Sequence, residues 1–571
     1  MPMIPWFNNL PLWVTAVPLL GALALLFVPK AKRRVFELGA LAIALLDFIL
    51  CVPLWFQYDR STAAVQWVTQ MDWIPSIGVK FSIGMDGISL VLFLLTTFIG
   101  AIAVWCSFTA ITERFKEFYI WLLVMQFTML GVFICQDMFL FYLFWEIMLV
   151  PMYFLIAIWG GPQKLYAAIK LFLYTLAGGV LMLVGILAIY FLQYKTTGTY
   201  DLSIASFHNM AGAISQQTQA FQVLLCLSFF LGFAIKVPMF PFHTWLPDAH
   251  VQAPTAGSVI LAGILLKMGT YGFVRFLLPI FPDILPTLMP WFLTLTIIGV
   301  VYGALVAMIQ KDMKKLVAYS SVSHLGLCML GLFALNPNGI MGGMFQMINH
   351  GISTSGLFLI VGIVYERRHV RMIADFGGLS KNMPIYATVF MIMTMSSIGL
   401  PGLNGFIGEF AILQGAFQAK PWWAVVATSG IILGAAYMLW LYQRVMFGKL
   451  DDINANMKDL NAREIAYFAP LVLACFWIGL RPAPIMKVLE KPIENLVMQI
   501  NPDFYKGQDL EQIKADAAQL GIGAMEAPER EDDVEVPIQY PYQQDEDEIG
   551  EAPQTQEESL DDDGEAGSGG R

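Results

Sequence analysis

About fourteen stretches of roughly 20 mostly apolar residues follow one another between positions 11 and 486, and each is long enough to cross the hydrocarbon core of a bilayer as a helix. Little chain is left over for a soluble domain. The sequence therefore predicts an all-α integral membrane protein with about 14 transmembrane helices. The expected spans are 11–29, 36–55, 87–109, 118–135, 138–159, 167–193, 220–241, 255–279, 289–309, 316–334, 340–364, 385–414, 423–446 and 466–486.

The composition agrees with a membrane location, apart from one end of the chain. Hydrophobic residues make up 57% of the sequence and charged residues 13%, against roughly 45 to 50% and 25% in soluble domains. The net charge of −10 is concentrated after residue 500, where 21 acidic and 4 basic residues leave the preceding part at +7. Such a charged, apolar-poor tail cannot bury enough surface to fold alone, so we expect it to be disordered.

The basic residues predict the orientation of the spans. Lys and Arg gather in alternate connections, and short basic loops mark the cytoplasmic face of a membrane protein. The prediction is a multi-pass protein of the bacterial inner membrane, or of the mitochondrial inner membrane, with both termini on the opposite, periplasmic side. One set of connections holds Lys30, Lys32, Arg33, Arg34, Arg114, Lys116, Lys164, Lys311, Lys314, Lys315, Arg367, Arg368, Arg371, Lys381, Lys449, Lys458 and Arg463, and the other holds little beyond Arg60, Lys80, Lys195 and Lys420.

Two spans contain residues that interrupt a helix. The seventh holds Pro238 directly after Lys236, and the twelfth holds Pro401 and Gly402. Proline removes an intrahelical hydrogen bond. Backbone left unpaired at membrane depth is tolerated only where it faces protein or a watery cavity. The two breaks therefore indicate an internal pathway.

The positions of these breaks suggest an internal duplication. Pro238 and Pro401 are 163 residues apart, and the fourth and ninth spans start at nearly the same separation. This spacing predicts two five-helix repeats, spans 4–8 and 9–13. Because five is an odd number, the second repeat starts on the opposite side of the membrane from the first and must be inverted. The expected divisions are an N-terminal three-span region (1–115), a first repeat (116–280), a second repeat (281–447), a last span (448–490) and an acidic tail (491–571).

Isolated ionisable residues lie inside both expected repeats. Glu146 is the one charged residue between positions 138 and 161, and a lone carboxylate at that depth costs roughly 2.5 to 3.5 kcal/mol or more. Lys236, beside the first break, is its expected partner. A pair that makes and breaks contact changes its proton affinity, whereas a static salt bridge that joins two helices is the structural alternative.

Further titratable groups continue the series. Lys267 lies at the centre of the eighth span, too deep to reach the interface easily. His324 and His350 lie in the tenth and eleventh spans, and histidine can relay protons near neutral pH. Each histidine could instead be a core residue bonded to a nearby hydroxyl or carbonyl, and this alternative makes His350 a secondary candidate, ranked below His324. Glu409 stands alone among apolar residues just after the second break.

Other polar residues lead to weaker hypotheses. His243, Asp248 and His250 combine common metal-ligand types, but no fourth ligand is evident, so we predict no metal site. They remain secondary candidates for proton transfer. Asp47, in the second span, has no evident partner and no assigned role. The six cysteines are scattered and are expected to be inert apolar side chains.

One segment resembles a known family closely. Residues 236–255 read KVPMFPFHTWLPDAHVQAPT and run on to GILLK at 263–267. This segment resembles the signature of the antiporter-like subunits of respiratory complex I and of Mrp-type cation/proton antiporters. In that family the broken twelfth helix carries a lysine in chains L and N and a glutamate in chain M. Because GFIGE ends here at Glu409, the resemblance is to the chain M group, and it covers about residues 1–490.

The resemblance implies a proton channel and assigns roles to its residues. Glu146 and Lys236 match the family's modulating pair, Lys267 its central proton-binding lysine, His324 its linking histidine and Glu409 the group nearest the exit. It also implies coupling to NADH oxidation and quinone reduction in partner subunits, which hold flavin and iron-sulfur clusters. This chain has neither a G-x-G-x-x-G motif nor a cysteine cluster, so we expect no cofactor in it.

The same resemblance names the expected partners, and three other readings stay open. Complex I membrane subunits, including neighbouring antiporter-like chains, and the lipid bilayer are the expected partners, and no nucleic acid is expected.

A subunit of an Mrp-type sodium/proton antiporter would share most of these motifs. A carrier for a small organic solute would need more polar clusters than the spans offer. A membrane scaffold would leave the cost of the buried charges unexplained.

Overall fold

The computed structural model describes residues 9–505 of the 571-residue chain. The part of the expected acidic tail from residue 506 onward lies outside the described residues. Twelve helical spans within residues 9–505 are long and apolar enough to cross a membrane. Two shorter apolar helices, α1 (Leu10–Leu26) and α18 (Pro384–Ser397), fall on the first and twelfth expected spans. Together they confirm the prediction of about 14 spans.

The twelve longer spans follow the predicted order, and their bounds lie within a few residues of the expected ones. They are α2 (Arg33–Gln57), α3 (Gly87–Ala110), α4 (Phe115–Ile134), α5 with α6 (Met138–Trp159), α7 (Lys164–Thr197), α10 (Gln219–Lys236), α12 to α14 (Thr255–Ile280), α15 (Leu285–Met308), α16 (Met313–Phe333), α17 (Pro337–Arg368), α20 (Pro421–Met446) and α21 (Ala462–Leu480).

Polar side chains fix the starts of several spans. Asp86, Asp137, Asp312 and Asn336 precede α3, α5, α16 and α17, and each side chain accepts a hydrogen bond from a backbone N–H of the first turn. Such N-caps satisfy donors that the helix itself leaves unpaired. The long apolar runs of the sequence therefore begin at defined residues.

A small hairpin departs from the all-α prediction. Strands β1 (Gln66–Ile74) and β2 (Val79–Met85) pair antiparallel around the short helix η2 (Pro75–Ile77), and Gly78 turns the chain with a φ of 70°. β2 is mostly buried, whereas β1 is mostly exposed. Gln136 N donates to Ser82 O at 2.9 Å, which joins the hairpin to the start of α5. The strands lie in the connection between the second and third spans.

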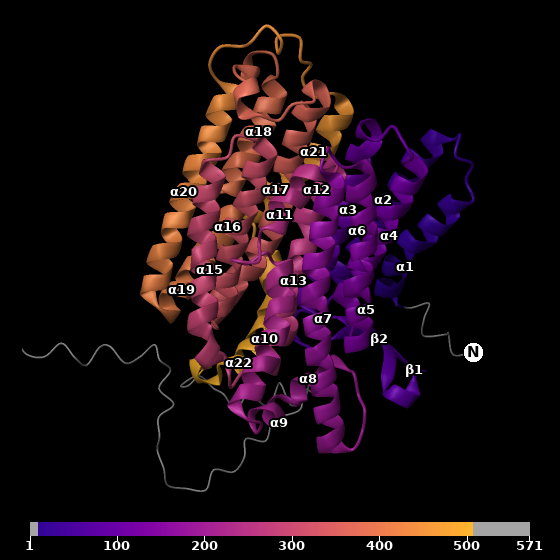
Figure 1. Cartoon of the computed structure of the whole chain (residues 1–571), viewed down its shortest axis with the longest axis vertical. Helices are drawn as coiled ribbons and strands as arrows, with labels where there is room; N and C mark the ends of the chain where they lie inside the picture. Colours follow the sequence, from indigo (N-terminus) through magenta and orange to yellow (C-terminus); the bar gives the residue numbers. More distant parts are fainter. Residues whose placement is uncertain (1–8, 506–571) are drawn as a thin grey trace, which may run out of the picture. The chain divides into compact units, whose positions relative to one another are not determined.

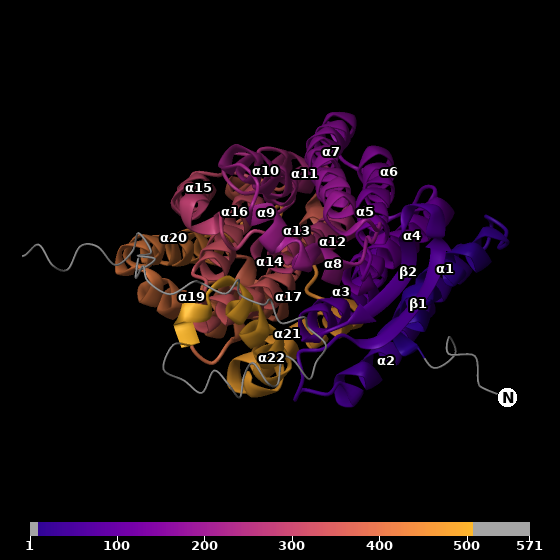
Figure 2. The ribbon, with the colours of Figure 1, turned by 90° about the horizontal axis from the view of Figure 1, so that it is seen from below.

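The helices lie side by side, and two spans are enclosed by the others. Figures 1 and 2 show α13 and α17 between the early helices α3 to α6 and the later helices α15, α16 and α20. The most apolar 18-residue stretch of the Thr255–Ile280 span is wholly buried, and so is that of α17. In α7 only 39% of the corresponding stretch is buried. The candidate residues Lys267 and His350 therefore lie on helices without a lipid-facing side.

Both predicted interruptions are present. α10 ends at Lys236 and α11 (Trp245–Gln252) resumes after a turn, while α18 ends at Ser397 and α19 (Asn404–Ala419) follows. The structure also shows an interruption that was not predicted: the fifth span is divided at Met148 into α5 and α6. The grouping of the spans into two inverted repeats stays a prediction.

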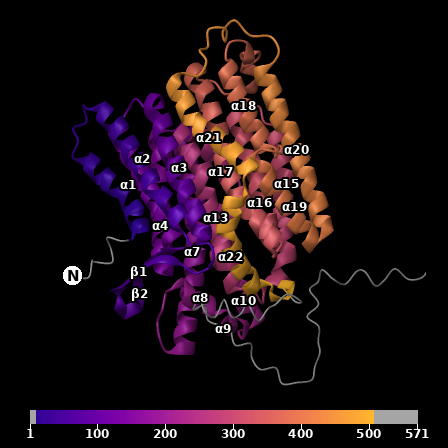
Figure 3. The same ribbon diagram turned by 180° about the vertical axis from the view of Figure 1, so that it is seen from behind.

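The last described α-helix, α22 (Ala483–Ile500), begins before residue 490, where the tail was expected to start, and the 3-10 helix η7 (Pro502–Tyr505) follows it. α22 packs against α3, α14 and α17 and is visible in Figure 3. An added Cβ at Gly87 would lie 1.9 Å from Val488 O. Glycine at the start of α3 therefore allows α22 to dock, and the helical part of the chain extends about ten residues further than expected.

Candidate functional site

Glu146 lies near the end of α5, against a glycine of the neighbouring helix α7. An added Cβ at Gly179 would be only 1.7 Å from Glu146 Oε1, so the carboxylate occupies the space that a larger residue would fill. The same oxygen is buried and has no hydrogen-bond partner. The helix division at Met148 follows two residues later. This carboxylate therefore fits the space that Gly179 leaves, and Lys236 is the charge that interacts with it.

Lys236, the last residue of α10, has an aromatic neighbour where an acidic one was expected. Its Nζ lies 4.2 Å from the centre of the Trp145 ring and has no hydrogen-bond partner. An ammonium over an indole face is stabilised by the negative charge of the ring face. Within residues 9–505, no ion pair joins Lys236 to Glu146. The two charges still interact electrostatically, and the Trp145 ring lies next to Lys236.

The break after Lys236 is satisfied locally. Trp245 Nε1 donates to Ile235 O at 2.8 Å, and Met239 N donates to Ala234 O at the same distance. These bonds replace ones that Pro238 cannot make. The lysine therefore sits at a helix end whose backbone is fixed, and its buried Nζ makes no hydrogen bond.

Lys267 is fully buried between two widened turns of its helix. α13 (Leu266–Gly272) is flanked by the π-helical segments η3 (Leu261–Leu265) and η4 (Phe273–Leu277). Its Nζ donates to Ala262 O inside η3 and lies 2.7 Å from His350 Nδ1. π segments often mark functional sites in helices. The lysine has one backbone partner and one titratable partner.

His350 continues into a second pair of groups. The rings of His350 and His324 have centroids 5.9 Å apart, and His324 Nδ1 lies 3.5 Å from Glu409 Oε1. Gln346 Nε2 donates to the same carboxylate oxygen at 3.2 Å. Lys267, His350, His324 and Glu409 thus form a continuous series of buried or nearly buried titratable groups, here called the buried line.

The second break lies beside the end of this line. Asn349 Nδ2 donates to Asn404 O at 2.7 Å, and Ser396 Oγ donates to Asn404 Oδ1 at 2.6 Å. An added Cβ at Gly399, which has a φ of 72°, would lie 2.3 Å from Glu409 Oε2. Glycine and asparagine therefore make room for the Glu409 carboxylate between α18 and α19.

Comparison with known proteins identifies the family. Residues 135–473 match the family described as NADH:quinone oxidoreductase/Mrp antiporter, TM. NADH-quinone oxidoreductase subunit M of Rhodobacter capsulatus is 44% identical over 508 residues, which cover 87% of this chain and 98% of that protein. The chain belongs to the NADH-quinone oxidoreductase subunit M family. NADH-ubiquinone oxidoreductase chain 4 of Arabidopsis thaliana is 43% identical over 482 residues, covering 84% of this chain and 95% of that protein.

Solved structures agree with this membership. A chain of respiratory complex I from Thermus thermophilus, solved with bound NADH, matches with a TM-score of 0.77 and 29% identity, covering 86% of this chain and 99% of that chain. A chain of the Mrp complex from a Dietzia species matches with a TM-score of 0.74 but only 21% identity, which shows a shared fold. The subunit M family is therefore favoured over the Mrp alternative.

In this subunit M family member, three of the secondary candidates, His243, Asp248 and His250, lie outside the buried line, as do Glu146 and Lys236. The ring of His243 lies 5.1 Å from that of Tyr302, and the ring of His250 stacks on Phe358 at 4.4 Å. Asp248 Oδ2 pairs with Lys170 Nζ at 2.7 Å. The described part of the chain contains no group of three His, Cys, Asp or Glu side chains placed to hold a metal ion.

Asp47, unassigned from the sequence, has a partner in the first expected repeat. Gln126 Nε2 of α4 donates to Asp47 Oδ2, and both side chains are buried. An added Cβ at Gly100 would lie 2.3 Å from Gln126 Oε1, so the glycine of α3 leaves room for the amide. The pair joins the N-terminal helices to α4.

Sequence reasoning missed several residues that shape the site. Trp145 and Gly179 contact the Lys236 and Glu146 side chains, and Gln346 binds Glu409. The signals were present: Gly179 is one of two adjacent glycines inside a span, and Gln346 lies one helical turn before His350. His350, ranked below His324 from sequence, is the direct neighbour of Lys267.

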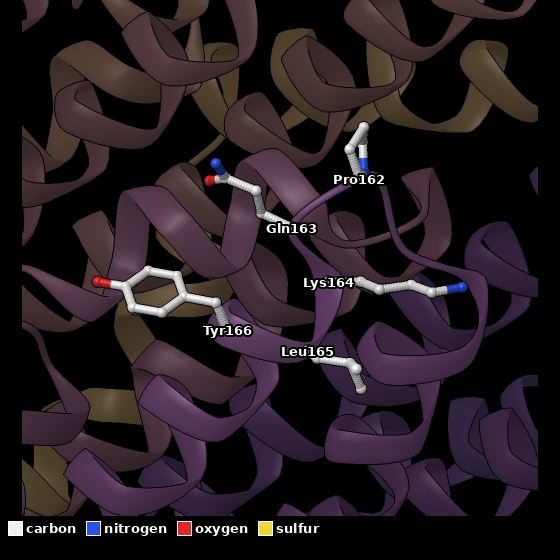
Figure 4. A pocket seen from close by; sticks show the side chains of 5 residues that line it. All are labelled: Pro162, Gln163, Lys164, Leu165 and Tyr166. Carbon is white, nitrogen blue, oxygen red and sulfur yellow. The ribbon is translucent and has the colours of Figure 1, made fainter.

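A surface pocket lies apart from these residues. It has a volume of about 570 Å³ and is lined by five consecutive residues at the start of α7 (Figure 4). No member of the buried line contributes to it. The lining residues are Pro162, Gln163, Lys164, Leu165 and Tyr166.

Proposed function

We propose that this chain translocates protons across the membrane as a membrane-arm subunit of NADH:quinone oxidoreductase. The observation that carries the proposal is the buried line, in which Lys267, His350, His324 and Glu409 follow one another from the first broken region to the second. Charged groups inside a membrane domain are costly and mark ion pathways. Four of them in succession provide sites at which a proton can be bound and passed on.

The steps follow from the contacts. Lys267 Nζ gives a proton to His350 Nδ1, which is within hydrogen-bond distance. The two imidazoles exchange it directly or through one water molecule. Glu409 accepts it from His324 and releases it toward the positive side of the membrane. Each transfer up to Glu409 moves one proton between two named side chains, and Glu409 gives the proton up to solvent water, so charge and atoms balance.

Glu146 and Lys236 act as the control on this line. Lys236 has no hydrogen-bond partner, so its ammonium can move between the Trp145 ring and the Glu146 carboxylate. Two unit charges about 4 Å apart interact by roughly 4 kcal/mol at an effective dielectric near 20. A movement of Lys236 toward or away from Glu146 therefore changes the proton affinity of both groups, and we propose that this change favours proton binding or release at Lys267.

Replacing His350 by Gln tests the line. Glutamine keeps a polar side chain in α17 but cannot carry a proton, so we expect proton pumping in membranes with the assembled complex to fall about tenfold. His369→Asn is the matched control, because His369 is exposed at the end of the same helix and has a φ of 56°, which asparagine tolerates. Native pumping by His350→Gln would remove His350 from the route.

The energy and the cofactors come from other subunits in this proposal. NADH oxidation and quinone reduction would take place in partners that hold flavin and iron-sulfur clusters, and neighbouring antiporter-like chains would complete the membrane arm. The relatives named as NADH-quinone oxidoreductase subunits support this assignment. Mass spectrometry of the intact complex would test it, since an Mrp-type antiporter would bring small membrane proteins and no flavin subunit.

The orientation is part of the same proposal. We expect a residue near Thr199 to face the positive side of the membrane and Lys315 to face the cytoplasm or matrix, following the basic loops. Both side chains are exposed, and the six native cysteines are buried. A single Thr199→Cys or Lys315→Cys variant should therefore react with an impermeant thiol reagent from opposite sides. Labelling of both from one side would contradict the orientation.

A further inference from the structure

A buried ion pair lies at the far end of the helix that carries Lys267. Arg275, in η4, places its Nη2 2.6 Å from Asp86 Oδ1, and the side chains are only 12% and 5% exposed. Asp86 is the N-cap of α3 and also accepts a hydrogen bond from Ser89 N at 2.9 Å. The start of α3 therefore fixes the position of the carboxylate that holds Arg275.

The guanidinium also donates hydrogen bonds to one residue of α3 and to one residue of its own helix. Arg275 Nη2 donates to Ser89 Oγ at 3.2 Å and Nε donates to Tyr271 OH at 3.3 Å. Tyr271 OH and Ser89 Oγ are themselves 3.2 Å apart. The bonds form a closed ring between α3 and the helix of Lys267, and Tyr271 lies four positions, about one turn, after that lysine.

The backbone of the same segment is held from a second direction. His208 Nε2, in the short helix α8 (Ile204–Asn209), lies 2.8 Å from Arg275 O. α8 lies between the membrane spans, and burial lowers the pKa of His208 to about 4. The imidazole is therefore neutral near pH 7 and can donate its Nε2 proton to the carbonyl. Both the side chain and the backbone of Arg275 are anchored to elements outside its helix.

We propose that Arg275 is a positioning residue for Lys267, held by Asp86 and His208. This inference rests on the proposed function, because it assumes that the place of Lys267 matters for pumping. Lys267 lies between two π segments, and such segments are local irregularities in helical winding. A one-residue change in winding turns the following residues by about 100° and shifts them by about 1.5 Å along the helix.

Such a change would take Lys267 away from His350. The two side chains meet at 2.7 Å, and a displacement of about 1 Å in a reacting geometry can lower a rate by about 100-fold. η3 is tied to Lys267 itself through Ala262 O, whereas η4 is tied to α3 and α8 through Arg275. The ion pair therefore fixes one end of α13 against structures that do not belong to the buried line.

The test is Arg275→Gln in the complete complex, compared with Arg367→Gln. Arg367 Nη2 lies 2.7 Å from Glu464 Oε2, with side chains 17% and 6% exposed, so the control removes an ion pair of similar length and burial. We expect proton pumping per electron to fall about tenfold in Arg275→Gln, with a changed pH profile. Arg275→Lys keeps the charge and should recover much of the pumping. Arg367→Gln should pump normally.

The outcomes separate this inference from the proposed function. Equal losses in Arg275→Gln and Arg367→Gln, or normal pumping with an unchanged pH profile in Arg275→Gln, would overturn the positioning role. If Arg275→Gln does not assemble, His208→Ala, which removes the bond to Arg275 O, decides the question: a pumping defect in the assembled complex supports the role, and native behaviour refutes it. A Lys267→Ala variant measured beside them reports on the proposed function alone.

Discussion

Replacing Lys267 by Ala should reduce proton pumping about 100-fold in membranes that contain the assembled complex. The lysine is the group through which the buried line connects with the first broken region, and alanine leaves His350 Nδ1 without its titratable neighbour. Electron transfer from NADH should slow as well if the two processes are tightly coupled. Proton uptake by vesicles and NADH oxidation, measured on the same membranes, give the two readouts.

Two further variants make the result specific. Lys267→Arg keeps a positive charge and should assemble more readily than alanine, but its pumping should stay low because a guanidinium does not release its proton at ordinary pH. Lys195→Ala removes an exposed lysine near the end of α7 and should pump normally. Normal pumping by Lys267→Ala in an intact complex would mean that this charge is structural and that protons take another route.

The substitution Gly179→Ala should abolish most pumping without removing any charge. The new Cβ would lie 1.7 Å from Glu146 Oε1, so the carboxylate must move away from α7. Because the displaced atom is the end of a flexible side chain, we expect the helices to keep their positions. A displaced carboxylate no longer meets Lys236 in the required geometry, and the pumping rate should fall roughly 100-fold, as in Glu146→Ala.

The control for this experiment is another glycine inside a span. An added Cβ at Gly434, in α20, would meet nothing nearer than Tyr437 OH at 3.8 Å, so Gly434→Ala should be silent. Glu146→Asp keeps the charge on a shorter side chain and should be milder than Glu146→Ala. If Gly179→Ala pumps normally while Glu146→Ala does not, the exact placement of the carboxylate is unimportant and only its charge matters.

The fold could be predicted largely because its strongest signals are local. Runs of apolar residues give the spans, and Pro238 and Pro401 give the breaks. The hairpin was missed because its strands lie in a connection, where hydropathy over a long window carries no information on pairing. The division at Met148 was missed although Pro151, three residues later, cannot donate the intrahelical bond to Ile147 O. The two π segments have no comparable proline inside them.

The site was predictable as a set of residues but not as a set of contacts. Glu146, Lys236, Lys267, His324 and Glu409 stand out because each is a charge or a histidine in an apolar run. Which of these side chains touch depends on the packing of helices far apart in sequence, and the sequence analysis did not predict all of those contacts. Lys236 lies against the Trp145 ring and makes no salt bridge with Glu146, although the two charges interact, and His350 lies beside Lys267 where His324 was expected to link the line.

The complete enclosure of α17 and of the Thr255–Ile280 span has a consequence for biosynthesis. Lys267 leaves the ribosome 83 residues before His350, its partner in the finished protein. A lysine at the centre of a lipid-exposed helix costs about 2.5 to 3.5 kcal/mol or more. Until α17 has been synthesised, the helix of Lys267 must therefore be sheltered by the insertion machinery or by the helices already made. The helix of Lys267 therefore reaches its final packing only after α17, which is translated later, has been inserted.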